Sequence, residues 1–148
     1  MFKHILIATD GSTLSNKAVR KGAELAKSTG AAATCVTVTP DYGAILSEGY
    51  LVPTLGVQRT QYQNKSDQHA RKLLDSAVAL AARKGVTCSV LHTVSDRPYE
   101  AIIAAAKRSK CDLILMASHS RRGLDRLLLG SETVKVLTHS TVPVLVVR

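Results

Sequence analysis

Five short apolar runs, separated by stretches of helical periodicity, constrain the fold of this chain more than any other feature. The first run, Ile5-Leu6-Ile7-Ala8, is continuous, which is typical of a strand buried on both faces. Helical crossovers between strands force parallel pairing with right-handed connections, so helices should cover both faces of the sheet. We expect strands at 3–9, 32–39, 87–93, 112–117 and 143–147, and helices at 12–29, 60–84, from 98, and at 131–139.

Length and composition indicate one globular α/β domain spanning residues 1–148. The chain can bury a substantial core, and its 45% apolar and 21% charged residues are ordinary for a soluble protein. No apolar stretch approaches the ~20 residues of a membrane span, and the first run is too short for a signal peptide. We therefore expect a cytoplasmic protein without a membrane segment. Cys35, Cys88 and Cys111 lie in or beside apolar runs without metal-ligand spacing, which predicts buried free thiols.

The formal net charge of +9 raises the question of nucleic-acid binding. Aromatic residues make up only 3% of the chain, so a stacking surface for single strands is lacking. Most basic residues are scattered at spacings expected of solvated helix faces. Only Arg121, Arg122 and Arg126 cluster. We therefore do not expect specific nucleic-acid binding.

That basic cluster lies in a loop with the features of an anion site. The loop joins the apolar run 113–116 to a helix start at Gly130-Ser131 and is rich in small and basic residues. Backbone N–H groups and the positive end of the helix dipole favour an anion such as phosphate at such a junction. The loop is thus the main sequence feature that points to a function.

A ligand in an open parallel sheet binds beyond the carboxyl ends of the strands, where the strand order reverses. The first strand ends at Ala8-Thr9-Asp10, and if it neighbours the fourth strand, Asp10 faces the loop at 117–131. Its carboxylate has two roles open to it. It can accept a hydrogen bond from a ribose or amino group, or it can cap the turn into the first helix.

The turn Asp10-Gly11-Ser12, the basic loop, Gly130-Ser131 and the ending 141–147 together resemble the universal stress protein family, over the whole chain. The resemblance implies a Rossmann-like, adenine-nucleotide alpha hydrolase-like sandwich with strand order 3-2-1-4-5. It also implies an ATP- or nucleotide-binding sensor or regulator in stress response, with ATP or another adenine nucleotide bound together with Mg²⁺. Three groups of residues would form the site: Ala8, Thr9, Asp10 and Val38 around adenine and ribose, Met116, Ala117, His119 and Ser120 in the loop, and Gly130, Ser131 and Glu132 at the phosphates.

The nucleotide-binding branch of that family carries Gly-x-x-Gly-x9-Gly-Ser/Thr, and this chain departs from it. Ala117 and Ser120 replace the first two glycines, while Gly130 and Ser131 match. A methyl at 117 can be absorbed if the backbone dihedrals are ordinary, whereas a left-handed conformation at 120 would cost roughly 1 kcal/mol. Glu132 would repel phosphate if it pointed inward, and we expect it to turn to solvent at the helix start. The alternative reading is a non-nucleotide-binding homodimeric interaction module of the same family.

Other chemistry is less well supported by the sequence. A Walker motif is absent, so a fast ATPase is not expected, although slow hydrolysis stays open. No Gly-x-Gly-x-x-Gly follows the first strand, which argues against a dinucleotide, and the histidines show no metal-ligand spacing. We assign no catalytic residue and no metal ligand.

Two further segments suggest contacts with partners. The connection 41–58 has no clean period and is either a functional lid or partner surface, or a variable insertion. Strand 142–147 is apolar up to Arg148 and would lie at the sheet edge, where pairing with a second copy would protect it. The sequence thus predicts a homodimer through this strand, a result the family resemblance also implies. A regulatory protein partner is expected but not identified.

Overall fold

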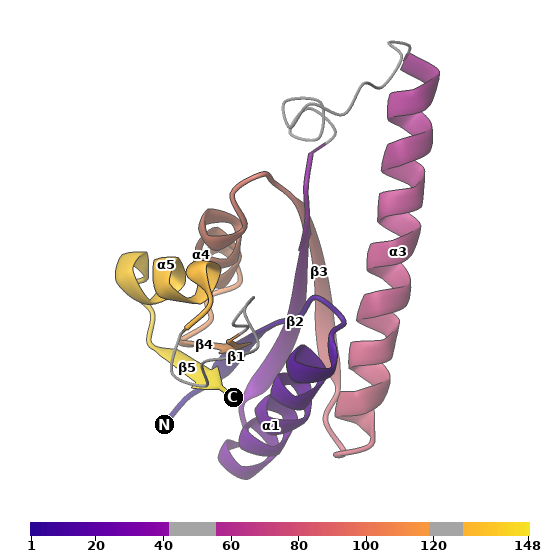
Figure 1. The fold of residues 1–148 in the computed structure, drawn as a ribbon. Helices are drawn as coiled ribbons and strands as arrows, with labels where there is room; N and C mark the ends of the chain where they lie inside the picture. The colour runs from indigo at the N-terminus through magenta and orange to yellow at the C-terminus, as the bar shows by residue number, and fades with distance from the viewer. Residues whose placement is uncertain (42–55, 119–128) are drawn as a thin grey trace.

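The computed structural model describes residues 1–41, 56–118 and 129–148, which form a five-stranded sheet flanked by helices (Figure 1). The strand order is β3-β2-β1-β4-β5, and every neighbouring pair is parallel. Both findings confirm the fold predicted from the sequence. The strands are β1 (His4–Ala8), β2 (Ala32–Thr39), β3 (Cys88–Val94), β4 (Leu113–Ala117) and β5 (Val144–Val147), and the helices are α1 (Thr13–Thr29), α3 (Gly56–Ala82), α4 (Pro98–Arg108) and α5 (Ser131–His139).

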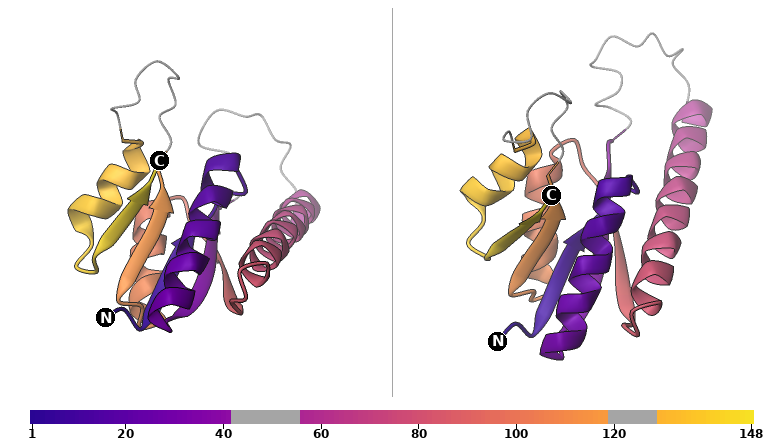
Figure 2. Two further views of the ribbon diagram at one scale, coloured as in Figure 1. Left: turned by 90° about the horizontal axis from the view of Figure 1, so that it is seen from below. Right: turned by 60° about the horizontal axis from the view of Figure 1, so that its bottom comes forward.

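Helices cover both faces of the sheet (Figure 2). α1 and α3 pack against the face that carries Ile5 and Ile7 of β1, while α4 and α5 pack against the face that carries Leu6. All three side chains are fully buried, because successive residues of a strand point to opposite faces. The continuous apolar run at the start of the chain therefore contributes to two cores.

α1 lies close to the sheet because Gly22 has no side chain at the contact. A methyl group at this position would lie 2.6 Å from Cδ1 and 2.9 Å from Cγ1 of Ile7. Ile7 is fully buried, so it cannot move aside without disturbing the core. A larger residue at position 22 would therefore push α1 away from β1.

Both ends of α1 are capped. Ser12 is the N-cap, and its hydroxyl oxygen accepts a hydrogen bond from the backbone N–H of Ser15 at 3.1 Å. Gly30 ends the helix with a φ of 70°, and its N–H donates to the carbonyl of Ala26. This left-handed conformation is one that glycine adopts without steric strain.

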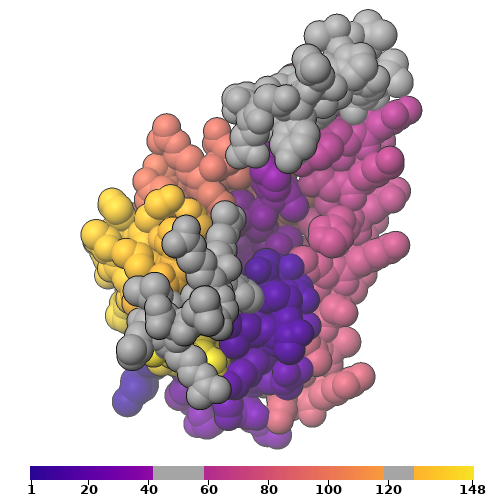
Figure 3. All heavy atoms as spheres, viewed as in Figure 1, coloured from indigo at the N-terminus to yellow at the C-terminus, as the bar shows by residue number. Residues whose placement is uncertain are grey.

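α3 is longer at its N-terminus than the sequence predicts. It begins at Gly56 rather than near Thr60, so the end of the predicted connection 41–58 is helical, and most of the rest lies outside the described residues. Arg59 and Thr60 are exposed, and exposed positions need no apolar period, so periodicity did not place them in the helix. α3 runs beside α1 (Figure 3).

None of the helices in the described segments is long and apolar enough to cross a membrane.

All three cysteines are buried and unbridged, as predicted. Cys35 and Cys88 point to the same face of β2 and β3, and a hydrogen bond between the two thiols, together with burial, raises the pKa of Cys35. Burial raises the pKa of Cys111 to about 11. Thiols with raised pKa values stay protonated near neutral pH, so Cys35 and Cys111 act as small apolar residues of the core.

An ion-pair cluster joins α1 to the turn after α3. The carboxylate of Glu24 lies 2.8 Å from Nζ of Lys84 and 3.0 Å from Nζ of Lys21. The hydrogen bond from Lys84, followed by that from Lys21, lowers the pKa of Glu24 from 4.5 to about 2. Because the folded-state pKa is the lower one, this stabilisation is present above pH 4.5 and is lost as the pH falls towards 2.

The ion pairs of Glu24 should make the stability of the protein depend on pH. We expect Glu24→Gln to melt at a lower temperature than the parent at neutral pH, and this difference in melting temperature to shrink as the pH falls below about 4.5. Thermal unfolding followed by circular dichroism across this range measures the effect. Asp75→Asn is the control, since Asp75 is exposed and makes no ion pair within the described part of the chain. A difference independent of pH would contradict the role given to Glu24.

Candidate functional site

A cavity of about 600 Å³ opens at the carboxyl ends of β1, β2 and β4. The strand order reverses here, since β1 lies between β2 and β4, and this is where ligands bind in open α/β sheets. The volume is within the range of small-molecule sites. Most residues predicted for the site line the cavity: Ala8, Thr9, Asp10, Val38, Met116, Ala117, Gly130 and Glu132.

Of the predicted site residues that the structure describes, Ser131 is the one that does not line the cavity. Ser131 is exposed at the first position of α5. His119 and Ser120 lie outside the described residues.

The cavity also has lining residues that the sequence did not indicate. Val36 and Ile102 form an apolar surface with the predicted Val38 and Met116, drawn from β2, α4 and β4. An apolar surface of this kind suits a flat ring such as a base. The remaining unpredicted residues come from the first turns of three helices: Ser12, Ser15, Pro98 and Thr133.

The turn between β1 and α1 forms the polar side of the cavity. Oδ1 of Asp10 accepts a hydrogen bond from the N–H of Ser12 at 3.0 Å, which is the capping role that the sequence allowed. Gly11 has a φ of 77°, a conformation that favours glycine. Beneath the turn, the hydroxyl groups of Thr9 and Ser15 are hydrogen-bonded at 3.1 Å and buried. The turn is thus fixed in place before any ligand arrives.

The start of α5 is tied to the end of β4. Gly130, the N-cap of α5, donates its N–H to the hydroxyl oxygen of Ser118 at 3.0 Å. The hydroxyl of Thr133 donates to the carbonyl of Ala117 at 3.4 Å. The positive end of the helix dipole therefore faces the cavity from a fixed position.

Ala117, the first of the two replaced glycines, causes no backbone strain. It belongs to β4, pairs with Val147 of β5, and packs in the core between the sheet and α1. The only non-glycine residue with a positive φ in the described segments is Lys110. The extra methyl group is therefore absorbed, as the sequence allowed for ordinary dihedrals.

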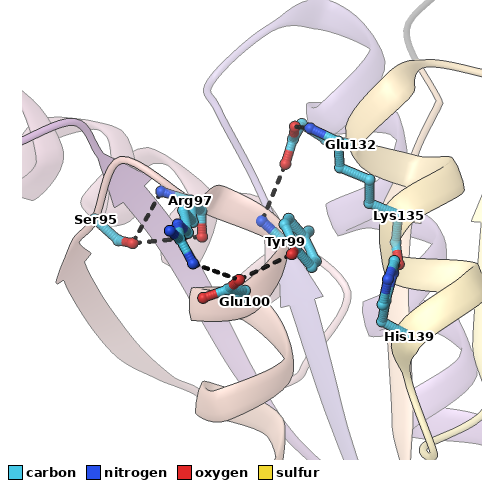
Figure 4. Close-up of polar contacts among 7 residues, drawn as sticks. All are labelled: Ser95, Arg97, Tyr99, Glu100, Glu132, Lys135 and His139. Atoms are coloured by element: carbon cyan, nitrogen blue, oxygen red, sulfur yellow. Dashed lines mark hydrogen bonds and ion pairs between the residues drawn. The ribbon is translucent and has the colours of Figure 1, made fainter. Parts of the chain in front are cut away.

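Glu132 does not turn away to solvent as we expected. Its side chain is 36% exposed, it lines the cavity, and its Oε2 accepts a hydrogen bond from the backbone N–H of Tyr99 at 3.0 Å (Figure 4). Its Oε1 pairs with Nζ of Lys135 at 2.8 Å. The prediction failed because the preference for acids at a helix start gives no information about α4, whose N-terminus lies next to α5. Glu132 thus connects the first turns of these two helices.

The cavity contains few groups suited to binding a metal ion by protein ligands alone. In residues 1–41, 56–118 and 129–148, no cluster of three or more His, Cys, Asp or Glu side chains could hold a metal. Asp10 and Glu132 are the carboxylates among the lining residues. Magnesium in nucleotide sites is commonly held by one or two carboxylates together with phosphate oxygens and water. The residues present therefore fit a cation only if it enters with a phosphate ligand.

The sheet order and the crevice at its switch point define a doubly wound α/β protein with a ligand-sized site between β1 and β4. The chain belongs to the universal stress protein family, whose family model matches residues 1–148. It is 32% identical to Universal stress protein YxiE of Bacillus subtilis, and the alignment covers 100% of both chains.

Solved structures show the same fold. The universal stress protein UspA from Lactobacillus plantarum superposes with a TM-score of 0.80 at 22% identity, covering 99% of this chain and 97% of that one. A universal stress protein in complex with cAMP gives 0.69 at 21% identity, covering 99% and 97%. One from Archaeoglobus fulgidus in complex with dAMP gives 0.71 at 19% identity, covering 100% and 98%.

Proposed function

We propose that this universal stress protein is an adenine-nucleotide-binding sensor or regulator in a stress response. The observation that carries the proposal is the preformed cavity of about 600 Å³ at the strand ends, apolar on one side and bordered by the start of α5 on another. Structural relatives that bind cAMP and dAMP support an adenine ligand. ATP with Mg²⁺ belongs to the same ligand class, and any hydrolysis is expected to be slow. The cytoplasm and an unidentified regulatory protein are the proposed setting and partner.

The lining residues divide between the parts of such a ligand. Val38 and Met116, with Val36 and Ile102, provide apolar contact for the base. Asp10 already accepts the N–H of Ser12 through one oxygen, and a carboxylate has further acceptor capacity for a ribose hydroxyl. Gly130 and Ser131 begin α5, whose dipole favours the phosphate. His119 and Ser120 stay assigned to the loop by the family resemblance alone.

The second candidate is a homodimeric interaction module that binds no nucleotide. The observation that favours it is the presence of two acidic side chains, Asp10 and Glu132, in the cavity wall. In that case the exposed edge of β5 would be the functional surface. The two candidates differ in one measurable property, which is whether the purified protein carries or binds a nucleotide.

The test combines mass spectrometry with calorimetry. We expect the denatured protein to release an adenine nucleotide, or titration with adenosine, AMP and ATP-Mg²⁺ to give heat and to raise the melting temperature. A ligand at 100 times its dissociation constant stabilises the fold by about 2.7 kcal/mol, which is easily detected. If no nucleotide is released, no heat appears and no ligand shifts the melting temperature at millimolar concentration, the interaction module is the correct candidate.

A further inference from the structure

The described residues that line the cavity have a net charge opposite in sign to that of the whole chain. The chain has a formal net charge of +9, yet the described residues that line the cavity include Asp10 and Glu132 and contain no Lys, Arg or His. A phosphate group close to this wall meets two carboxylates. This described part of the wall therefore disfavours ligands with several negative charges.

Glu132 is held in this wall by the backbone of α4. Pro98 at the first position of α4 has no N–H, so Tyr99 is the first helical residue that can donate one, and Oε2 of Glu132 accepts it at 3.0 Å. A carboxylate at a helix N-terminus occupies the place that a bound anion would otherwise take. Glu132 thus places a negative charge at the start of α4 (Figure 4), and it is one of the residues that line the cavity.

Lys135 offsets this charge only in part. It pairs with the other oxygen of Glu132, but its side chain is 48% exposed and does not line the cavity. Its ammonium group lies 5.6 Å from the centre of the Tyr99 ring, which in turn packs against His139. Because Glu132 lines the cavity and Lys135 does not, a ligand inside the cavity lies closer to the carboxylate than to the ammonium group. The carboxylate therefore acts on such a ligand more strongly than Lys135 does.

We propose that Glu132 makes this site select adenine ligands by charge, favouring nucleosides and monophosphates over free triphosphates. The inference rests on the proposed function, because it concerns which nucleotides the same cavity accepts. Mg²⁺ reduces the charge of ATP, so it reduces the discrimination. Glu132 acts here as a specificity-determining residue and not as a catalytic one.

Glu132→Gln removes the charge and keeps an oxygen that can accept the N–H of Tyr99. We expect the ratio of ATP affinity to adenosine affinity, measured by calorimetry without Mg²⁺ at low salt, to rise roughly tenfold in this variant. The rise for AMP over adenosine should be smaller. Both changes should shrink with Mg²⁺ present or in 0.5 M KCl, since salt at about that concentration screens exposed charges.

Glu100→Gln is the matched control. Glu100 lies in the first turn of α4 and is bonded to Arg97 and the Tyr99 hydroxyl, but it does not line the cavity. The same charge is removed, yet the affinity ratio should stay at the parent value. Melting temperatures of both variants establish that they are folded.

The outcomes separate the inference from the proposed function. If adenosine binds and Glu132→Gln leaves the ratio unchanged, or if Glu100→Gln raises it equally, selection by Glu132 is wrong while nucleotide binding stands. If parent and variants bind none of the three ligands, the proposed function fails, and the inference fails with it.

Discussion

Gly130→Val is expected to weaken the binding of adenine nucleotides by roughly 100-fold. Gly130 lines the cavity at the start of α5, where a phosphate would come closest to the backbone. A branched side chain placed in a close contact costs about 1–3 kcal/mol, and the upper end of that range corresponds to this loss. Calorimetric titration with AMP and ATP-Mg²⁺ measures it.

The variant should still fold, which makes the measurement interpretable. Gly130 has a φ of −61° and a ψ of 148°, an extended conformation that valine adopts readily. Gly130→Ala is the graded control, because one methyl group should give an intermediate loss. A folded Gly130→Val protein that binds as tightly as the parent would place the ligand away from α5.

Lysine substitutions in β5 are expected to convert a homodimer into a monomer. β5 lies at the end of the sheet, and β4 is its only strand neighbour within the described segments. Leu145 is 43% exposed, and an apolar edge strand invites pairing with another strand. We propose that two copies pair along this edge, antiparallel by two-fold symmetry. Val144→Lys combined with Val146→Lys should give the monomer mass in analytical ultracentrifugation.

Val144 also packs against the core beneath α4 and α5, so the double variant carries a risk to folding. Leu145→Lys avoids this risk because the side chain is already exposed, and it too should shift the protein towards monomer. Val90→Lys is the control, since Val90 is 50% exposed on β3 at the opposite edge of the sheet. Loss of the dimer in Val90→Lys alone, with both β5 variants still dimeric, would place the interface at β3.

The sequence predicted the fold correctly, and it indicated that the residues after the first strand would lie at the end of the sheet where the cavity opens. Apolar runs define strands, and the residues that follow them must meet at one edge of a parallel sheet. Asp10 was predicted in this way, whereas Val38 and Met116 were implied by the family resemblance, and all three line the cavity.

What the sequence missed depends on how helices pack. Ile102 lies on α4, and the sequence of this helix does not tell which of its buried residues reaches the cavity. Ser15 was missed because its hydroxyl joins Thr9 only after α1 has packed on β1. The orientation of Glu132 depends on the N–H of Tyr99, from a helix far away in the sequence. Such contacts are properties of the tertiary arrangement and leave no local pattern.

Because β1 lies in the middle of the sheet, its two neighbouring strands are synthesised at very different times. Among the strands of this sheet β1 is translated before the others, yet one of its two neighbours, β4, begins only at Leu113. Gly130, Glu132 and Thr133 follow later still and complete the wall of the crevice. A growing chain can pair β1 with β2 early, but it has no complete pocket until α5 has been synthesised. A small molecule that binds in this pocket can stabilise the chain only after α5 has been synthesised and has folded. Cellular ligand levels would therefore change how long the folded protein persists, and not how the chain folds during synthesis.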